Sequence, residues 1–359
     1  MIPKSIEETK MFDKLIRGKT LENAFYSILN LEFEEDDLTD FQEFICALID
    51  ITLTKLEEFP PTDDKILNTA RTIKDLKDKD TFKCGSIYYI KMNKNDCFYI
   101  MGDIHGDKNT FQTFFEKTQF FKNPSKDVKL VFLGDYIDRG LFGLNVLTSL
   151  IYLKMVADKQ IILLRGNHEI WEEQNGDIVP TALGDNMFLE FWKDYFNMNT
   201  IKKIKEFFDK LPVIVLLSNE IVLVHAGIPR PIDGNYNYIE NLNSLNEKER
   251  LYEIMWSRPE EKDDVFISYG SPHFSFAKKQ FVEFMNHIGG KLMIRGHDPE
   301  GFKEYYDGKL ITIFSTGGSE NETAYEFYRL TEPYYLQIFN GKIYVCNIFP
   351  YKPLKTNGG

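Results

Sequence analysis

The strongest constraint on the fold of this 359-residue chain is a pattern that occurs five times. In each case a short apolar run is followed, within about three residues, by a side chain that can bind a metal ion. The runs cover residues 98–101, 130–133, 161–164, 221–224 and 292–294, and the side chains after them are Asp103 and His105, Asp135, Asn167, His225 and His297. Such a run is typical of a buried strand, and a nearby glycine indicates a turn. With His168, which directly follows Asn167, four of the six histidines lie at these strand ends. The pattern therefore predicts one site built from several strands.

Strand and helix patterns alternate through the middle of the chain. Helices are expected at residues 110–121, 188–208 and 277–288. Strand pairs joined by short turns are expected at 86–92 with 97–101, at 212–217 with 221–224, and at 335–339 with 342–348 around Asn340-Gly341. Alternating strands and helices followed by a β-rich end predict an α/β (α+β layered) fold, with ligands on loops at one edge of the sheets.

Residues 1–80 differ from the rest because they hold helical patterns and no cluster of reactive side chains. The best helix begins at Asp40, carries an apolar stripe on one face and ends at Pro60-Pro61. A second helix is expected after Thr62, with its stripe running to Leu76. We therefore expect an N-terminal helical region at 1–80, packed on a catalytic domain at 81–351, and a loose tail at 352–359. The alternative is that these helices have a regulatory role or bind a protein partner.

Composition and charge disfavour several classes of function. With 43 Lys and Arg against 55 Asp and Glu, the formal charge is −12, which argues against non-specific nucleic-acid binding. No apolar run is long enough to predict a membrane span, and the first residues lack the apolar region of a signal peptide. The four cysteines form no CxxC pair and are expected to be reduced thiols in a cytosol-like compartment. We expect a cytoplasmic protein, or one secreted into a host cytosol as an effector.

The residue types at the strand ends suit the hydrolysis of a phosphate ester. This reaction needs an activated water, neutralisation of charge on the phosphoryl oxygens and a proton for the leaving group, and two adjacent metal ions supply the first two. Asp103 and His105 can bind one ion, and Asp135 can bridge both. The other ion can be completed by Asn167, His225 and His297. Mixed carboxylate, amide and imidazole donors suit Mn, with Fe or Zn as alternatives, better than Ca or Mg.

The proton and the phosphate contacts are expected from residues beside these ligands. His168 follows a ligand without being needed as one, so it can act as the general acid. Asp138 can hold its ring in the required tautomer, and Arg139 offers a planar fork for phosphate oxygens. Asn167 is expected beside the phosphate as well as the metal. Arg165, Arg295, His273 and His287 are interpreted as structural.

Three motifs resemble those of the phosphoprotein phosphatases, a branch of the calcineurin-like metallophosphoesterases. They are Gly102-Asp103-Ile104-His105-Gly106, Gly134-Asp135-Tyr136-Ile137-Asp138-Arg139-Gly140 and Gly166-Asn167-His168-Glu169, and His225 and His297 follow in the matching order. The resemblance covers about residues 97–350 and leaves out the N-terminal helices. It implies a central β-sandwich of two mixed sheets flanked by helices, with a dimetal site at the strand ends. It also implies hydrolysis of phosphoserine and phosphothreonine in proteins by direct attack of a water bound to both metals.

Four departures mark a divergent member of that family. The first motif continues to Asp107, where the family has Gln, and the loop at 315–320 replaces one that carries Tyr and Cys. Gly270 stands near the place of a second phosphate-binding Arg, so Arg230 or Arg258 is expected to substitute, Arg230 first. The run Ala226-Gly227-Ile228-Pro229 is similar to that of diadenosine-tetraphosphate hydrolases.

The sequence thus predicts a phosphoric monoester hydrolase that acts on phosphoproteins, serine and threonine first. A phosphotyrosine preference and the hydrolysis of dinucleotide polyphosphates stay open as alternatives. A third alternative is a scaffold without activity that binds partners through residues 1–80, but the complete set of ligands and the acid argue against it.

Overall fold

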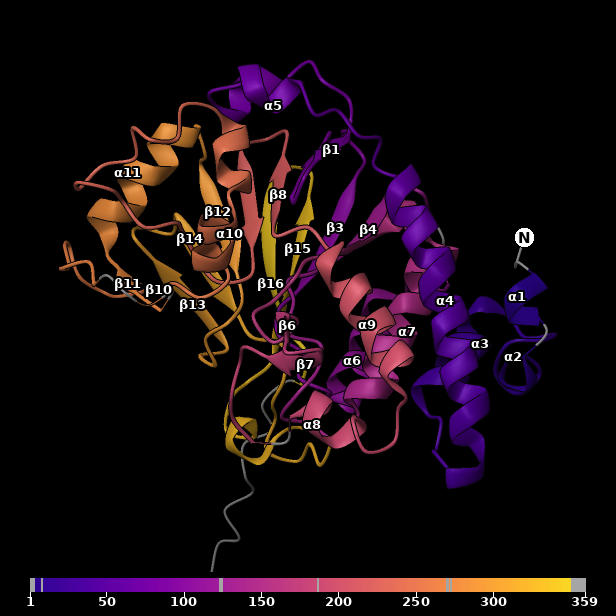
Figure 1. Ribbon diagram of the computed structural model, residues 1–359. Coiled ribbons are helices and arrows are strands. Elements are labelled where there is room, and N and C mark those ends of the chain that lie inside the picture. The colour runs from indigo at the N-terminus through magenta and orange to yellow at the C-terminus, as the bar shows by residue number, and fades with distance from the viewer. Residues whose placement is uncertain are drawn as a thin grey trace, which may run out of the picture.

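Two β-sheets face each other in the computed structural model, which describes residues 4–7, 9–122, 125–185, 187–268, 271 and 273–349 (Figure 1). The expected tail at 352–359 lies outside the described residues. In spatial order, the seven-stranded sheet contains β1 (Phe82–Cys84), β2 (Ile87–Ile90), β8 (Ile214–Leu217), β9 (Ile221–Val224), β12 (Leu292–Arg295), β14 (Leu310–Ile313) and β13 (Phe302–Tyr305). The five-stranded sheet contains β16 (Lys342–Asn347), β15 (Tyr334–Phe339), β3 (Cys97–Met101), β4 (Val128–Phe132) and β5 (Ile161–Leu163).

The apolar runs are continuous because their strands are buried on both faces. Ile162 and Leu164 belong to the core between the two sheets, whereas Ile161 and Leu163 belong to the core on the outer face of the five-stranded sheet. Successive side chains of a strand point to opposite faces, so a strand covered on both sides needs an apolar residue at every position. Both sheets contain parallel and antiparallel pairs, which confirms the predicted mixed sheets.

Helices cover the outer face of each sheet (Figure 1). On the five-stranded sheet lie α6 (Lys108–Thr118), α7 (Gly143–Val156), α8 (Phe188–Trp192) and α9 (Met198–Asp209), with η3 (Asp158–Gln160) before β5. On the seven-stranded sheet lie η4 (Leu242–Asn246), α10 (Lys248–Ile254) and α11 (Lys278–Ile288). Two short pairs, β6 (Trp171–Gln174) with β7 (Asp177–Pro180) and β10 (Arg258–Pro259) with β11 (Ser275–Phe276), and η5 (Glu326–Tyr328) lie in the connections.

The N-terminal residues contribute to both helical layers. The helices α3 (Leu21–Leu29) and α4 (Leu38–Glu58) contact α7, and α4 also contacts α9, so they extend the core outside the five-stranded sheet. Before them come α1 (Lys4–Glu7), α2 (Lys10–Leu15) and η1 (Glu35–Asp37). The helix expected after Thr62 is instead split into α5 (Ile66–Thr69) and η2 (Ile73–Leu76), because Ala70 is extended and accepts a hydrogen bond from Leu242 N of η4. Its apolar residues join the core outside the seven-stranded sheet. A domain boundary at residue 80 stays a prediction.

Two of the three predicted hairpins are confirmed. The strands β8 and β9 pair antiparallel, as do β15 and β16 around Asn340-Gly341. The first hairpin is wrong, because β2 pairs with β1 and β8 in one sheet while β3 pairs with β4 and β15 in the other. The turn after Asn93, closed by a hydrogen bond from its N–H to Asp96 Oδ2 (2.8 Å), therefore leads the chain from one sheet to the other.

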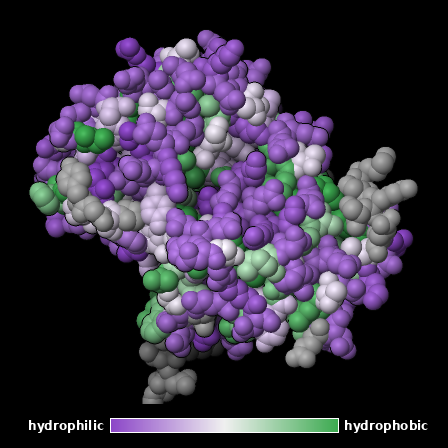
Figure 2. All heavy atoms as spheres, viewed as in Figure 1, coloured by the Kyte–Doolittle hydropathy of each residue, from purple (hydrophilic) through white to green (hydrophobic). Residues whose placement is uncertain are grey.

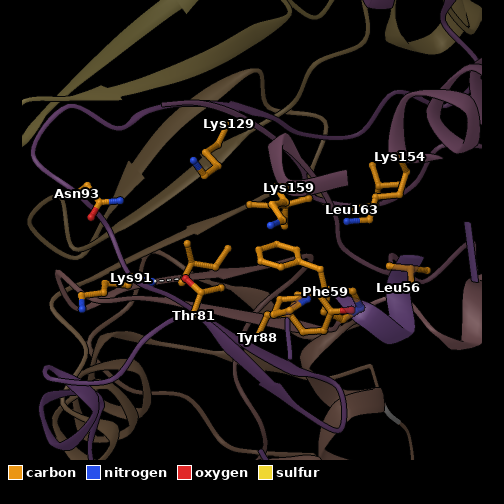
Figure 3. Close-up of a pocket in the computed structure, with 14 residues that line it drawn as sticks. Leu56, Phe59, Thr81, Tyr88, Lys91, Asn93, Lys129, Lys154, Lys159 and Leu163 are labelled. Atoms are coloured by element: carbon orange, nitrogen blue, oxygen red, sulfur yellow. Dashed lines mark hydrogen bonds between the residues drawn. The ribbon is translucent and has the colours of Figure 1, made fainter. Parts of the chain in front are cut away.

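A small pocket of about 110 Å³ lies beside the beginning of β4 and β5, away from the strand ends that precede Asp135 and Asn167 (Figure 3). Four lysines line it together with apolar residues of α4, β2 and β5. Three of the four pair with acids of the chain: Lys91 with Asp80 (2.9 Å), Lys129 with Asp96 (3.7 Å) and Lys154 with Asp158 (2.7 Å). The charge of the pocket is largely balanced within the protein, and we assign it no ligand. No helix among the described residues is long and apolar enough to cross a membrane.

Phe44 of α4 tests how much the N-terminal helices stabilise the whole fold. Its side chain is fully buried in the core that α4 shares with α7 and α9. Phe44→Ala is expected to lower the free energy of unfolding by about 3–5 kcal/mol, because it removes apolar contacts and leaves a cavity. Denaturant unfolding measures this. Thr54→Ala, on the exposed face of the same helix, should change the free energy by less than about 0.5 kcal/mol. Equal effects of the two substitutions would contradict the assignment.

Candidate active site

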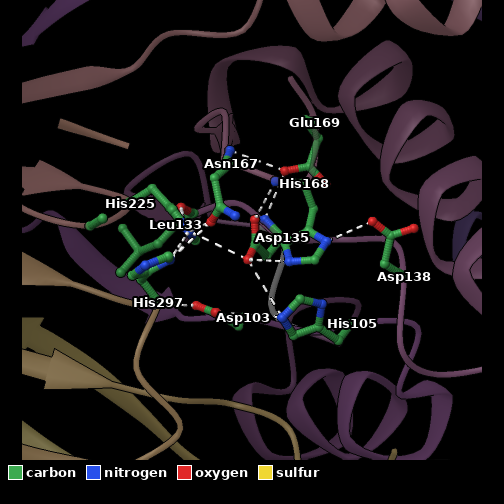
Figure 4. Close-up of polar contacts among 12 residues, drawn as sticks. Asp103, His105, Leu133, Asp135, Asp138, Asn167, His168, Glu169, His225 and His297 are labelled. Carbon is green, nitrogen blue, oxygen red and sulfur yellow. Dashed lines mark hydrogen bonds and ion pairs between the residues drawn. The ribbon is translucent and has the colours of Figure 1, made fainter. Parts of the chain in front are cut away.

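The ends of five strands from both sheets bring the predicted ligands together at one edge of the sandwich (Figure 4). The strands β3, β4 and β5 run parallel to one another, as do β9 and β12 in the other sheet, so their carboxyl ends lie side by side. The six predicted metal ligands are all buried, with exposed fractions between 0% and 8%: Asp103, His105, Asp135, Asn167, His225 and His297. Six polar side chains gathered in the interior need partners for their charges and lone pairs.

The first group consists of Asp103, His105 and Asp135. His105 Nε2 lies 3.7 Å from Asp103 Oδ2 and 3.5 Å from Asp135 Oδ2. His105 Nδ1 hydrogen bonds to the carbonyl of Ile137 (3.0 Å), which leaves Nε2 to face the carboxylates. Asp103 Oδ2 is buried and has no hydrogen-bond donor among the described residues, while Asp103 Oδ1 accepts from His297 N (2.8 Å). An orphaned carboxylate oxygen beside an imidazole nitrogen fits a cation.

The second group shares Asp135 with the first. His225 Nε2 lies 3.4 Å from Asp135 Oδ2, 2.8 Å from Asn167 Oδ1 and 3.2 Å from His297 Nδ1. His297 Nδ1 in turn lies 2.9 Å from Asn167 Oδ1. His225 Nδ1 faces the carbonyl of Leu133 (2.9 Å), so Nδ1 carries a proton and Nε2 is the nitrogen turned towards Asp135 and Asn167. Lone pairs that converge in this way require a shared positive charge. Donors that bind one ion at about 2 Å lie roughly 3–3.5 Å apart, so these residues also fit a metal.

Burial and the neighbouring charges set the protonation states of the ligands. Burial would raise the pKa of Asp135, but His225 and His168 outweigh it and hold the pKa well below its usual range. Burial lowers the pKa of His105 to about 4. Burial, helped by Asp135 and opposed by His225, raises the pKa of Asp103 to about 7. An ionised Asp135 and a neutral His105 are the forms that bind metals.

His168 lies on the opposite side of Asp135 from the second group and is held by Asp138. His168 Nδ1 is 2.6 Å from Asp138 Oδ2, and Nε2 is 3.8 Å from Asp135 Oδ2. Asp138 Oδ1 accepts a hydrogen bond from Phe188 N (2.5 Å), so the carboxylate is fixed at both oxygens. Burial would lower the pKa of His168, but Asp135 and Asp138 outweigh it and raise the pKa to about 9.

Glu169 has a structural role in the site that the sequence did not predict. Its buried carboxylate accepts hydrogen bonds from Asp135 N (2.8 Å), Tyr136 N (2.8 Å) and Gly166 N (3.0 Å). It thus ties the loop after β4 to the loop after β5. Burial, with Asp135 nearby, raises its pKa to about 7. The only sequence signal for Glu169 was its position, directly after the predicted ligand Asn167 and the predicted acid His168.

Several site residues adopt backbone conformations that side chains rarely favour. The φ angles are positive for His105 (47°), Asp135 (55°), Asp138 (65°), Arg139 (70°) and His297 (74°). Each such residue costs free energy and persists only where its surroundings hold it, and such residues cluster at functional sites. Gly134 (φ 106°) precedes Asp135, and a Cβ there would lie 2.4 Å from Gly166 N, so only glycine fits between the two loops.

The arginines differ in what they contact. Arg139 lies against Gly184, and its guanidinium is 5.9 Å from the ring of Tyr325. Arg258 Nε lies 3.2 Å from His297 Nε2, directly beside the second group, and 3.4 Å from Asp298 Oδ1. The guanidinium of Arg230 instead pairs with Glu253 (2.8 Å) and lies over Phe274. Arg165 pairs with Asp209 and buried Arg295 with Asp298, in keeping with the structural roles expected for them. Gly270 lies outside the described residues.

Two of the sites that depart from the family pattern, Asp107 and the loop at 315–320, contact each other. The carboxylate of Asp107 is fully buried and caps α6 by accepting from Thr110 N (3.2 Å). It also accepts hydrogen bonds from the replaced loop and the residues after it, namely from Thr316 Oγ1, Gly317 N, Asn321 Nδ2 and Thr323 Oγ1. This loop leads to Tyr328, whose ring lies 5.6 Å from that of His105. The sequence predicted neither this link nor the approach of Tyr328.

Comparisons with known proteins agree with this geometry. The model of the calcineurin-like phosphoesterase family matches residues 98–301, more than half of the chain. The serine/threonine-protein phosphatase 4 catalytic subunit of Saccharomyces cerevisiae is 27% identical over 267 residues, which cover 70% of this chain and 82% of that protein. Its counterpart from Candida glabrata is 30% identical over 220 residues, 60% of this chain and 67% of that protein.

The fold of a solved relative matches as well. A protein serine/threonine phosphatase from Saccharomyces cerevisiae, described as similar to human phosphatase PP5, superposes with a TM-score of 0.57 at 18% identity. The match covers 87% of this chain and 91% of that one, and it shows the shared fold. The chain is thus homologous to serine/threonine protein phosphatases, which are phosphoric monoester hydrolases. It belongs to the calcineurin-like phosphoesterases and, within them, to the phosphoprotein phosphatase family.

Proposed function

We propose that this protein hydrolyses phosphoserine and phosphothreonine in protein substrates by means of a dinuclear metal site. The observation that carries the proposal is the position of Asp135, because one carboxylate oxygen faces the imidazoles of His105, His168 and His225 at 3.4–3.8 Å. Asp103, His105 and Asp135 would hold one ion. Asp135 would share the other with Asn167, His225 and His297. When bound, the ions supply the water nucleophile and neutralise the phosphoryl oxygens; the mixed donors favour Mn, with Fe or Zn as alternatives.

The remaining chemistry comes from side chains of the chain. His168, held at Nδ1 by Asp138, presents Nε2 to the interior of the site and donates its proton to the leaving alkoxide. Asp138 fixes the tautomer and orientation of that ring. Arg139 binds phosphoryl oxygens, and the side-chain amide of Asn167 contacts the phosphate as well as the metal. Arg230 is largely buried and pairs with Glu253 at 2.8 Å, whereas the side chain of Arg258 is 57% exposed, pairs with Asp298 at 3.4 Å and lies beside His297. We therefore assign the second phosphate contact to Arg258 rather than Arg230.

A direct comparison of substrates tests this function. The chain, stripped with a chelator and reloaded with Mn, is assayed on a phosphoserine peptide, a phosphotyrosine peptide and diadenosine tetraphosphate. We expect turnover only after reloading, and fastest on phosphoserine. Faster cleavage of diadenosine tetraphosphate, which the run Ala226-Gly227-Ile228-Pro229 suggested, would replace the proposal. No turnover of these substrates or of para-nitrophenyl phosphate between about pH 6 and 9 would favour a scaffold.

Replacement of the general acid should separate metal binding from catalysis. His168→Ala is expected to keep both metals and to lower kcat on phosphoserine by about 10²–10⁴-fold, because leaving-group protonation contributes that much. The loss should be smaller on para-nitrophenyl phosphate, whose leaving group needs less help. Metal analysis and kcat on both substrates measure this. His287→Ala on α11, whose ring contacts the carbonyl of Ile239, is the matched control. Near-native rates on phosphoserine would exclude the acid role.

Glu169 should matter for metal affinity although it is not a ligand. Glu169→Gln keeps the size of the side chain but replaces one acceptor oxygen by an N–H donor that would face backbone N–H groups of the Asp135 loop. Mn binding, measured by calorimetry, is expected to weaken by about 10–100-fold. Glu173→Gln, at an exposed position of β6, should bind Mn like the unaltered chain. Unchanged affinity in Glu169→Gln would show that the loop holds Asp135 without this carboxylate.

The second phosphate contact distinguishes two arginines. Arg258→Ala is expected to raise KM for the phosphoserine peptide and the inhibition constant of inorganic phosphate by about tenfold, because a charge-assisted contact is lost. Arg230→Ala serves as the comparison, since its guanidinium is engaged by Glu253. A larger effect of Arg230→Ala on phosphate inhibition, with an unchanged melting temperature, would return the role to Arg230.

A further inference from the structure

Large apolar side chains are exposed next to the candidate active site. Among the described residues only five large apolar side chains are more than two-thirds exposed, and four of them belong to three segments around Arg139 and His105: Leu141 (82%), Leu183 (77%), Phe327 (69%) and Leu330 (93%). We call these four the apolar rim. Exposed apolar side chains that are grouped rather than scattered mark a binding surface.

Each member of the rim is close in the chain either to Arg139 or to a residue that lies near Arg139 or His105. Leu141 comes two residues after Arg139. Leu183 precedes Gly184, whose backbone is so close to the Arg139 guanidinium that a Cβ there would lie 2.1 Å from Nη1. Phe327 and Leu330 flank Tyr328, whose ring lies 5.6 Å from that of His105. The three segments therefore surround the position where a phosphate would meet Arg139.

The rim is held in place rather than formed by loose loops. Tyr325 Oη donates to Asp185 Oδ2 (2.7 Å), which joins the segment of Phe327 to that of Leu183. The Tyr325 ring also faces the Arg139 guanidinium, which joins both to the segment of Leu141. The buried carboxylate of Asp107 anchors the residues before η5 through Thr316, Asn321 and Thr323. A pre-organised surface loses little entropy when a ligand binds.

Figure 2 shows one face of the molecule, on which most side chains are hydrophilic. Apolar side chains gather at its lower left edge, where Figure 1 draws the yellow segment near residue 325. The protein carries a formal charge of −12, so an apolar rim at the mouth of the site stands out from an otherwise acidic chain. In a substrate, acidic residues beside the phosphorylated residue would gain no favourable contact with the rim, whereas bulky apolar residues there would bury apolar surface against it.

We propose that the apolar rim binds bulky apolar residues of the substrate polypeptide next to the phosphorylated residue. This inference rests on the proposed phosphatase function and names its substrate class. The occupant follows from continuity: a polypeptide whose phosphate reaches Arg139 and His168 passes over the rim. An extended chain rises about 3.3 Å per residue, so the residues that meet the rim are near neighbours of the phosphorylated one in the peptide.

The experiment compares two phosphoserine peptides of equal length and charge, one with leucines and one with serines around the phosphoserine. The unaltered, Mn-loaded chain is expected to prefer the leucine peptide by about tenfold in kcat/KM, with the difference in KM, as one buried side chain gives. The double variant Phe327→Ser, Leu330→Ser is expected to lose most of this preference while its melting temperature stays the same. Val345→Ser, a 43%-exposed residue of the edge strand β16, is the matched control and should keep the preference.

The outcomes separate this inference from the proposed function. Turnover of para-nitrophenyl phosphate with equal KM for both peptides would overturn the rim proposal alone. The rim proposal would also fall if the double variant keeps the preference, or if it only abolishes self-association in sedimentation, since the rim would then be a contact between two copies. An absence of turnover on every phosphate ester would overturn the phosphatase function and the rim proposal together.

Discussion

The carboxylate of Asp135 is the group on which the rest of this structure depends. It is buried where the ends of the two sheets meet, and imidazoles of His105, His168 and His225 face one of its oxygens. A charge removed from water in this way is tolerated only when opposite charges or metals balance it. The balancing groups come from both sheets, because β3 precedes His105 and β9 precedes His225. The site can therefore form only when the carboxyl ends of strands from both sheets lie at the same edge of the sandwich.

The backbone conformation of the loop that carries Asp135 is unfavourable by itself. Asp135, Asp138 and Arg139 all have positive φ angles, which cost free energy in residues with side chains. Two hydrogen bonds to Glu169, from the N–H groups of Asp135 and Tyr136, hold the start of this loop, and the salt bridge between Asp138 and His168 holds its end. Both partners follow β5. His168 and Asp135, the proposed acid and the proposed bridging carboxylate, are thus oriented by one pair of loops, and a shift of either loop would move both.

Much of the site could be predicted because its signals are local. A short apolar run and the side chain that follows it are adjacent in the chain, and parallel strands put their carboxyl ends at one edge. The features that were missed depend on contacts between distant segments. Glu169 acts on a loop that lies 34 residues away in the chain, and Tyr328 approaches His105 from a segment near the other end of the chain. The wrong prediction of a hairpin at 86–101 has the same origin. A turn signal indicates that the chain bends, but the sheet that each strand joins depends on the strands available for pairing. Here β2 pairs with β8, and β3 pairs with β4.

Asp107 joins the loop of a candidate metal ligand to a segment that departs from the family pattern. Its carboxylate lies two residues after His105, caps α6 and accepts hydrogen bonds from three side chains of the segment before η5. The segment that brings Tyr328 to His105 is thereby fixed to the same loop that positions His105. A change at Asp107 would therefore alter the loop of the first metal group and the apolar surface beside it together, so these two features depend on each other even though they are more than two hundred residues apart in the chain.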